Sequence, residues 1–223
     1  MASLWVAFGG VQAQNLQPVP GCTGDLDGDG AINLNDLIVL LAHYGTTCPA
    51  PEPVVPAALW ISEIHYNPSS IQGDDTVWEF IELYNPSPSP VNVSGWTLSN
   101  AVTCLLPDGA NIAGHGFLVV CRNVDSLATQ VPTGVPIFPW TPTSSLNNTG
   151  ETIEIKRPDG SLADAVAYED NDGWMTAPDG GGPSLEWMDV GLNNDEAASW
   201  AASFIFGGTP GRMNSMWGLG DPE

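Results

Sequence analysis

Basic residues are scarce in this chain. Of 223 residues, only 4 are lysine or arginine and 3 are histidine, against 26 aspartates and glutamates, so the formal charge at pH 7 is −22. A surface of this sign repels phosphate backbones and anionic lipid headgroups, so we expect no nucleic-acid partner. The same charge favours attraction to divalent cations. Because 43% of the residues are hydrophobic and only 13% are charged, the chain does not have the composition of a disordered acidic tail.

Long apolar runs are also missing. Beyond the N-terminus no segment is apolar for long enough to cross a bilayer, so we predict no membrane span. Residues 1–13 are apolar and end in the small residues Val11 and Ala13, which are typical of a signal-peptide cleavage site, although they lack a basic start. We interpret residues 1–13 as a signal-peptide remnant, which predicts a secreted or cell-surface protein; the alternative is an apolar N-terminus without that role.

Cysteine is rare, but the four cysteines form an even set, which is consistent with an oxidising compartment. Cys22 and Cys48 bracket an acidic loop and a helical pattern, and a disulfide between them would contribute roughly 3–4 kcal/mol in the chain-entropy model. Cys104 and Cys121 lie in two nearby apolar runs and could pair across strands, with free thiols as the alternative. None of the four has the spacing of a zinc ligand.

Familiar catalytic motifs are absent: there is no Gly-x-Ser-x-Gly, no His-Glu-x-x-His and no phosphate-binding loop. His65 shares a strand face with Glu63, which is conceivable as a base with its orienting carboxylate, but we favour a structural role. Glu79 and Glu82 are three residues apart and should point to opposite faces of a strand, which argues against a glycosidase carboxylate pair. We therefore predict that the chain is not an enzyme.

What the sequence does contain is a calcium-loop pattern from Asp25 to Asp36. Oxygen-bearing residues occupy the positions that coordinate Ca²⁺ in an EF-hand, and Gly30 stands at the sixth position, where that loop bends sharply. Asp36 closes the loop where glutamate is usual. A plain acidic turn is the alternative. The predicted ligands are the carboxylates of Asp25, Asp27 and Asp29, the carbonyl of Ala31, Asn33 through water, and Asp36.

An apolar helix is predicted directly after this loop. Leu34, Leu37, Ile38 and Leu41 recur at helical spacing, and Gly45 suits the helix end. The opposite face is apolar as well, through Val39, Leu40 and Tyr44. A helix that is apolar all round must be buried, so we expect helix 34–44 either to dock on the following domain or to be covered by a partner.

Together, residues 22–48 resemble a single type I dockerin repeat, through Asp25-x-Asp-x-Asp-Gly30-x-Ile-Asn-x-x-Asp36 and the leucine-rich helix. Dockerins anchor proteins by binding cohesins, so the resemblance implies a cohesin-like partner. They normally carry two repeats. The closest second candidate, Asp170-Asn-Asp-Gly173 with Asp179, has Tyr168 at its first position and no helix after it, so we interpret it as an exposed turn.

A proline-rich linker, residues 49–57, separates this unit from a region with strand periodicity. Short apolar runs alternate there with Gly, Pro, Asn and Asp turns, which predicts an all-β sandwich. The tail, 173–214, is expected to add one strand at 185–188 and an irregular wrap pinned by Trp174, Trp187 and Trp200; a sugar site lined by these tryptophans is the alternative. The predicted strands are 59–66, 77–84, 91–98, 117–121, 152–156 and 162–168.

This β region resembles a lamin-tail domain. The resemblance is carried by Ile61-Ser-Glu-Ile-His-Tyr-Asn-Pro68, Glu79-Phe-Ile-Glu-Leu-Tyr-Asn85, Val93-Ser-Gly-Trp-Thr-Leu98 and Gly150-Glu-Thr-Ile-Glu-Ile155. It implies a mainly β, immunoglobulin-like β-sandwich over residues 58–214, followed by a tail at 215–223. It also implies a secreted bacterial protein built of several modules. The resemblance indicates a fold and a location more than it indicates a reaction.

The sequence thus predicts a secreted, non-catalytic, calcium-binding protein that binds or anchors at the cell surface. The alternative is an accessory subunit of an extracellular polysaccharide hydrolase system, docked through the dockerin-like repeat. The protein or cell-surface partner is not identified by the sequence, and the oligomeric state is left open.

Overall fold

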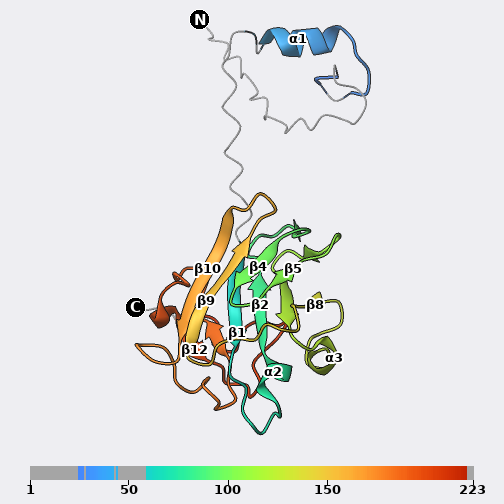
Figure 1. The fold of residues 1–223 in the computed structure, drawn as a ribbon. Helices are drawn as coiled ribbons and strands as arrows, with labels where there is room; N and C mark the ends of the chain where they lie inside the picture. The colour runs from blue at the N-terminus through green and yellow to red at the C-terminus, as the bar shows by residue number, and fades with distance from the viewer. Residues whose placement is uncertain (1–24, 28, 43, 45–58, 220–223) are drawn as a thin grey trace, which may run out of the picture. The chain divides into compact units, whose positions relative to one another are not determined.

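The computed structural model describes residues 25–27, 29–42, 44 and 59–219 (Figure 1). The chain divides into two compact units, residues 1–54 and 55–223. The signal-peptide interpretation of residues 1–13, the Cys22–Cys48 disulfide and the linker at 49–57 lie outside the described residues, and they stay predictions.

The first unit contains one described helix, α1, from Leu34 to Ala42. It begins where the acidic loop ends, as the apolar spacing predicts. Its large apolar side chains are nevertheless exposed, from 47% for Leu37 to 69% for Leu34. The burial expected of an all-apolar helix is not provided by the described residues of this unit. Burial of α1 against the following domain, or against a partner, therefore stays a prediction.

The second unit is built on a six-stranded sheet in the order β12-β11-β1-β2-β7-β8 (Figure 1). Neighbouring strands are antiparallel except β7 and β8, which are parallel. β1 and β2 lie in the centre, and the connection between them, residues 66–79, contains a helical turn. The strands are β1 Trp60–His65, β2 Phe80–Tyr84, β7 Phe117–Cys121, β8 Ile137–Pro139, β11 Leu185–Trp187 and β12 Trp200–Ala202.

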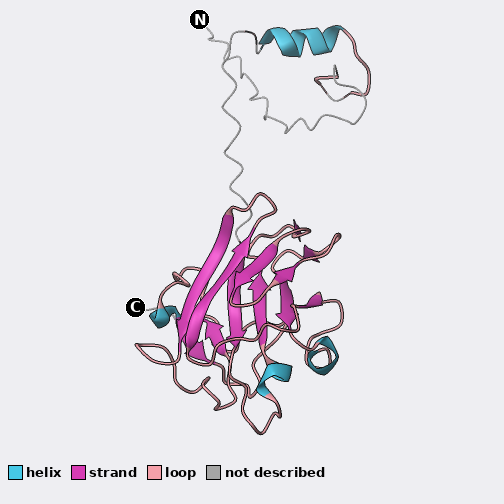
Figure 2. Cartoon of the chain, viewed as in Figure 1, coloured by secondary structure: helices cyan, strands magenta, loops and turns pink. Residues whose placement is uncertain are grey.

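A second sheet, in the order β10-β9-β4-β5, forms the other layer, and β3 and β6 form a separate two-stranded pair. Figure 2 shows that strands and loops make up most of this unit. The long β9–β10 hairpin turns at Gly160, whose φ of +83° needs a residue without a side chain. The mainly β, immunoglobulin-like sandwich expected from the sequence is confirmed. The strands are β3 Val91–Asn92, β4 Thr97–Asn100, β5 Cys104–Leu105, β6 Asn111–Ile112, β9 Gly150–Lys156 and β10 Leu162–Glu169.

Three short helical turns interrupt the strands: α2 Asp75–Trp78, α3 Val124–Leu127 and the 3₁₀ turn η1 Ala197–Ser199. The strand predicted from Val77 is therefore wrong at its start. The Asp74 carboxylate accepts a hydrogen bond from the Thr76 N–H, 3.1 Å away, and so caps α2. The predicted strand 91–98 divides into β3 and β4, because Gly95 turns the chain with a φ of +74°.

The main core lies between the two sheets. The six-stranded sheet contributes side chains such as Ile61, Ile81 and Leu118, and the facing sheet contributes Ile153 and Val166, all fully buried. At 25 cal/mol for each Å² of apolar surface removed from water, full burial of one such side chain stabilises by about 1.5–3 kcal/mol. The sandwich is therefore held mainly by aliphatic packing.

The outer face of the six-stranded sheet is covered too. Phe80, Val119 and Cys121 point away from the main core and pack with Leu127 of α3 and with Val131. Further along the same face, β1, β2 and β11 carry glutamates that are fully buried. All five residues of β2 are buried, so this strand is shielded from water on both sides.

The tail is part of the sandwich, because β11 pairs with β1 and β12 pairs with β11. Trp174, Trp187 and Trp200 all belong to the main core, which confirms that they pin the tail. The indole N–H of Trp200 donates to the Asn194 carbonyl over 2.8 Å. The alternative of a sugar site lined by these three tryptophans is wrong, since their rings are inside the protein.

Cys104 and Cys121 are free thiols in this structure. Cys104 lies on β5 of the four-stranded sheet and faces the main core, whereas Cys121 ends β7 and faces the outer cluster with Phe80. The cross-strand disulfide expected between them is therefore not formed. Its two strands belong to different sheets, which the nearness of the two apolar runs in the sequence did not reveal.

Trp200→Ala should lower the free energy of unfolding by about 3–5 kcal/mol, because it empties a fully enclosed aromatic site. Urea denaturation followed by circular dichroism measures this. Phe204→Ala is the matched control: that ring is 72% exposed, so the change should stay within about 0.5 kcal/mol. Equal losses in the two variants would contradict the burial described for the tail.

Candidate metal centre

Three of the predicted calcium ligands converge in the acidic loop. Asp25, Asp27 and Asp29 each offer a carboxylate oxygen, and these oxygens lie within 4.8 Å of one another. Gly30 follows with a φ of +86°, the left-handed conformation that the sixth loop position requires. Its N–H donates to the Asp25 carboxylate over 2.8 Å. The bend thus turns the chain back so that alternate side chains meet at one point.

Asp36 closes the loop through backbone amides. Its Oδ1 accepts from the N–H of Leu26 at 2.6 Å and from that of Asp27 at 3.3 Å, and its Oδ2 accepts from the N–H of Asn33 at 2.6 Å. The side chain is buried. Residues ten apart in the sequence are therefore held together by one carboxylate, which fixes the start of the loop against the first turn of α1.

Asn33 caps α1. Its side-chain oxygen accepts from the N–H of Asn35 at 2.8 Å, while the Asp36 carboxylate reaches back to the N–H of Asn33. This reciprocal arrangement is a capping box. The amide nitrogen of Asn33 donates to Asp29 at 3.1 Å and more weakly to the Ala31 carbonyl at 3.5 Å. The loop and the helix therefore form one hydrogen-bonded unit.

The electrostatics of the loop fit a cation. Loss of solvent around Asp27, together with the charges of Asp29, Asp36 and Asp25, raises the pKa of its carboxyl against the lowering effect of the Asp29 N–H. The N–H of Asn33, followed by those of Leu26 and Asp27, lowers the pKa of Asp36 against partial desolvation. Hard oxygen donors with mutually repelling charges suit Ca²⁺.

The structure therefore brings together Asp25, Asp27 and Asp29, which would hold the ion. Asp36 and Asn33 are engaged with the backbone and with the loop, and Ala31 lies between Asp29 and Asn33 in the same turn. The complete set of six ligands stays a prediction. The second acidic turn, at Asp170–Asp179, does not bring three such carboxylates together within the described residues.

The catalytic candidates in the sandwich are enclosed. His65 is buried against Phe80, with the ring centres 5.5 Å apart, and burial lowers its pKa to about 4. Glu63 accepts from the hydroxyl of Ser184 and the N–H of Thr209. Hollows on the described surface of the sandwich include one of about 580 Å³ beside Asn67 and Asp74, one beside Phe117 and one beside Phe206, and neither His65 nor Glu63 lines any of these three.

Glu79 and Glu82 do not form a pair either. Glu79 accepts from the N–H of Leu146 at 3.2 Å, and Glu82 accepts from the Ser62 hydroxyl and the Gly211 N–H, both at 2.7 Å. The two carboxyls are thus bound to different parts of the chain. The opposite strand faces expected from their spacing do not apply, however, because Glu79 caps the end of α2 and precedes β2.

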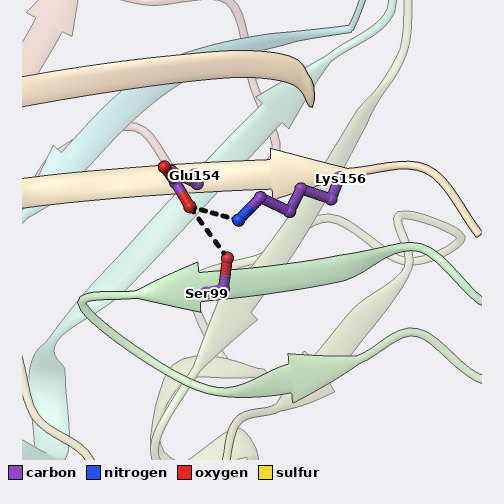
Figure 3. A network of polar contacts seen from close by, with 3 residues as sticks. All are labelled: Ser99, Glu154 and Lys156. Carbon is purple, nitrogen blue, oxygen red and sulfur yellow. Dashed lines mark hydrogen bonds and ion pairs between the residues drawn. The ribbon is translucent and has the colours of Figure 1, made fainter. Parts of the chain in front are cut away.

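The single lysine is on the surface. The Lys156 ammonium lies 2.6 Å from Glu154, which also accepts from the Ser99 hydroxyl at 3.2 Å (Figure 3). The hydrogen bond from Lys156, and then its charge, lowers the pKa of Glu154 against partial desolvation. This is the only ion pair among the residues that the structure describes, so lysine neutralises none of the buried carboxylates.

One cluster was missed by the sequence reasoning. Glu63, Glu82 and Glu186 are all fully buried and lie side by side on β1, β2 and β11, because Glu63 is in register with Glu82 on one side and with Glu186 on the other. A charged residue inside an otherwise apolar strand was the available signal, but strand pairing cannot be read from one sequence.

Comparison with known families gives one match. The model of the lamin tail domain family matches residues 54–170, just over half of the chain. The match includes β1 to β10 and stops before β11 and β12. No curated protein matches the chain. In the part of the chain that the structure describes, no helix is long and apolar enough to cross a membrane.

Asp36→Ala should loosen the loop and fray the start of α1, because three backbone N–H groups lose their acceptor. NMR secondary chemical shifts of residues 33–37 in the full chain should move toward random-coil values.

The same shifts in the wild type should move in the same direction in acid. The lowered pKa of Asp36 stabilises the loop above the ordinary aspartate range, and that contribution is lost as the pH falls through the folded-state pKa. Asp172→Ala, in the other acidic turn, should leave these shifts unchanged; unaltered shifts in Asp36→Ala would contradict the capping role.

Proposed function

Because the chain belongs to the lamin tail domain family, whose immunoglobulin-like fold is typically non-catalytic, we propose that it is a calcium-binding protein that binds or anchors outside the cell. The observation that carries this proposal is the meeting of three carboxylates in the loop before α1. The β-sandwich supplies a stable body, and the loop and helix supply the functional unit.

Calcium binding is supported by the chemistry of the loop. Three carboxylates at alternate positions, followed by a left-handed glycine, reproduce the first half of an EF-hand loop. Their mutual repulsion is relieved when a divalent cation binds, so the ion would stabilise the loop and the start of α1 together. Metal affinity in such a small unit is largely folding free energy.

A binding or anchoring role is supported by α1. Leu34, Leu37, Ile38, Leu40 and Leu41 expose apolar surface on both sides of the helix. Exposed apolar surface of this kind is typical of a protein-binding element. A role outside the cell rests on the signal-peptide interpretation of residues 1–13 and on the disulfide expected between Cys22 and Cys48.

A second candidate follows from the same unit. If the partner of α1 is a cohesin-like module, the chain is an accessory subunit of an extracellular hydrolase system. The order of an acidic loop and an apolar helix favours this reading. The buried positions of His65 and Glu63 favour a non-catalytic role for the sandwich in both cases.

Calorimetry should detect calcium binding at one site in the wild-type chain. Asp25→Ala and Asp29→Ala should each abolish it, because each removes a converging carboxylate and its charge. Asp172→Ala is the matched control: it also removes one acidic charge, but outside the loop, and should bind calcium as the wild type does. Calcium binding retained by Asp25→Ala or Asp29→Ala would refute the site.

The partner can be sought with the same variants. Purified chain immobilised with calcium should retain its partner, and chelation or Asp25→Ala should release it, because α1 depends on the loop. A retained cohesin-bearing scaffold would select the accessory-subunit function, and a retained cell-surface component would select anchoring. If the partner is retained equally after chelation and by Asp25→Ala, a role for the loop in binding is contradicted.

A further inference from the structure

The buried glutamates are covered by one segment of the tail. We call residues 203–217 the C-terminal strap. Its backbone N–H groups reach all three carboxyls: Thr209 donates to Glu63 at 2.7 Å, Gly211 to Glu82 at 2.7 Å and Met216 to Glu186 at 2.9 Å. The strap is therefore fastened to three neighbouring strands through side chains that carry the same ionisable group.

The backbone of the strap passes close to the carboxyl of Glu63. A Cβ at Gly208 would lie 2.2 Å from the Glu63 carboxyl, and the φ of this glycine is +79°. Beyond the glutamates, the side-chain amide of Asn214 donates to the carbonyls of Ser62 and Trp187 at 2.8 and 2.9 Å. Asn214 thus gives the strap an anchor that carries no charge, beside the contacts that depend on the carboxyls.

No positive charge compensates the three carboxyls. Among the described residues no lysine or arginine donates to Glu63, Glu82 or Glu186. Arg212, on the strap itself, donates to the carbonyls of Gln130 and Pro210. Burial lowers the pKa of His65 to about 4 and raises that of Cys121 to about 12, so both are neutral near pH 7. The titratable or charged groups on the elements around the cluster include His65 on β1, Tyr84 on β2, Cys121 and Arg122 at the end of β7, and Arg212 on the strap.

The number of protons at the Thr209 hydroxyl limits which of its contacts can be hydrogen bonds. Its hydroxyl oxygen lies 2.8 Å from Glu186 Oε1 and 3.2 Å from Glu63 Oε2, yet a hydroxyl has one proton. The other oxygen of Glu186 already accepts from the Ser215 hydroxyl at 2.8 Å and from the Met216 N–H. Both contacts of Thr209 are hydrogen bonds only if one of these two carboxyls supplies a second proton, and the raised pKa of Glu63 assigns that proton to Glu63.

We propose that these side chains form a proton-dependent latch: Glu63 is a neutral carboxylic acid that donates to the Thr209 oxygen, the Thr209 hydroxyl donates to an ionised Glu186, and loss of the Glu63 proton loosens the C-terminal strap. Each contact in the series Glu63, Thr209 and Glu186 then joins one hydrogen-bond donor to one acceptor. Deprotonation would leave two carboxylates facing one hydroxyl proton in a dry site, so that the carboxylates repel each other and the Glu63 oxygen repels the hydroxyl oxygen of Thr209 on the strap.

The electrostatics agree with this arrangement. Burial, and then the charge of Glu186, raises the pKa of Glu63 to about 8. Burial, and then the charge of Glu63, raises the pKa of Glu82 well above its ordinary value. A raised folded-state pKa stabilises fully below the unfolded value, near 4.3, and this contribution is lost as the pH rises toward the folded value. The strap is therefore held most tightly in acid.

Carbon-detected NMR of the glutamate side-chain carboxyls in the full wild-type chain tests the protonation directly. The Glu63 carboxyl should show the neutral form at pH 6 and titrate near pH 8, and the carboxyl of Glu169, exposed at the end of β10, serves as the reference signal. An ionised Glu63 at pH 6 would overturn the proposal, and this measurement needs no variant to fold.

Amide hydrogen exchange tests the strap. After correction for the intrinsic rate, protection of the amides of Thr209, Gly211 and Met216 should fall as the pH rises from about 5 to 8, by about tenfold for each pH unit through the proton that Glu63 releases on opening, and by more where Glu82 releases one as well. Glu63→Gln should make this dependence less steep, since its amide can donate to Thr209 at every pH. Glu169→Gln should keep the wild-type slope.

A further variant separates the latch from simple packing. Thr209→Val keeps the shape of the side chain but removes the hydroxyl, so protection of the Met216 amide should fall already at pH 6, whereas Thr209→Ser should retain it. Strap protection that does not vary with pH in the wild type, or an unchanged slope in Glu63→Gln, would reject the latch.

Discussion

The six-stranded sheet needs cover on both of its faces, and the rest of the sandwich is arranged around that need. β2 is buried along its whole length, and β1 is buried from Ile61 to His65. One face is covered by the second sheet through aliphatic packing. The other is covered by α3, by the stretch around Val131 and by the C-terminal strap. Without the strap, the polar row on β1, β2 and β11 would be open to water.

Two clusters of carboxyls in the same chain illustrate two solutions to one physical problem. Carboxylates that lie close together repel, and the repulsion is relieved either by a cation or by a proton. Asp25, Asp27 and Asp29 lie in a loop accessible to ions, whereas Glu63, Glu82 and Glu186 are sealed under the strap. The depth of burial therefore favours an ion in one cluster and a shared proton in the other.

Much of this fold could be predicted from local pattern. The strand 117–121 was predicted with the bounds that β7 has, and the predicted helix begins at Leu34 as α1 does. Strands such as β5 and β6 were not predicted, because two residues are too few to show an alternating pattern. Val77 and Trp78 were assigned to a strand because their composition is apolar, but capping by Asp74 favours a helical turn there.

The two carboxyl clusters also differ in how far the sequence predicts them. The convergence of Asp25, Asp27 and Asp29 follows from residue spacing within one loop, so the sequence contained it. The row of Glu63, Glu82 and Glu186 depends on strand register, with β11 more than a hundred residues after β1 and β2 in the sequence, and spacing carries no information on register. For the same reason the sequence did not reveal that Cys104 and Cys121 face different clusters.

The edge of the six-stranded sheet has a consequence for assembly. β8 is an outermost strand, it runs parallel to β7, and it ends in Pro139. A proline lacks the N–H that an added strand would need, and proline on an edge strand is a recognised protection against edge-to-edge pairing. Growth of this sheet into a neighbouring molecule is therefore disfavoured at β8, and recognition of the sandwich there must proceed through side chains instead of backbone pairing.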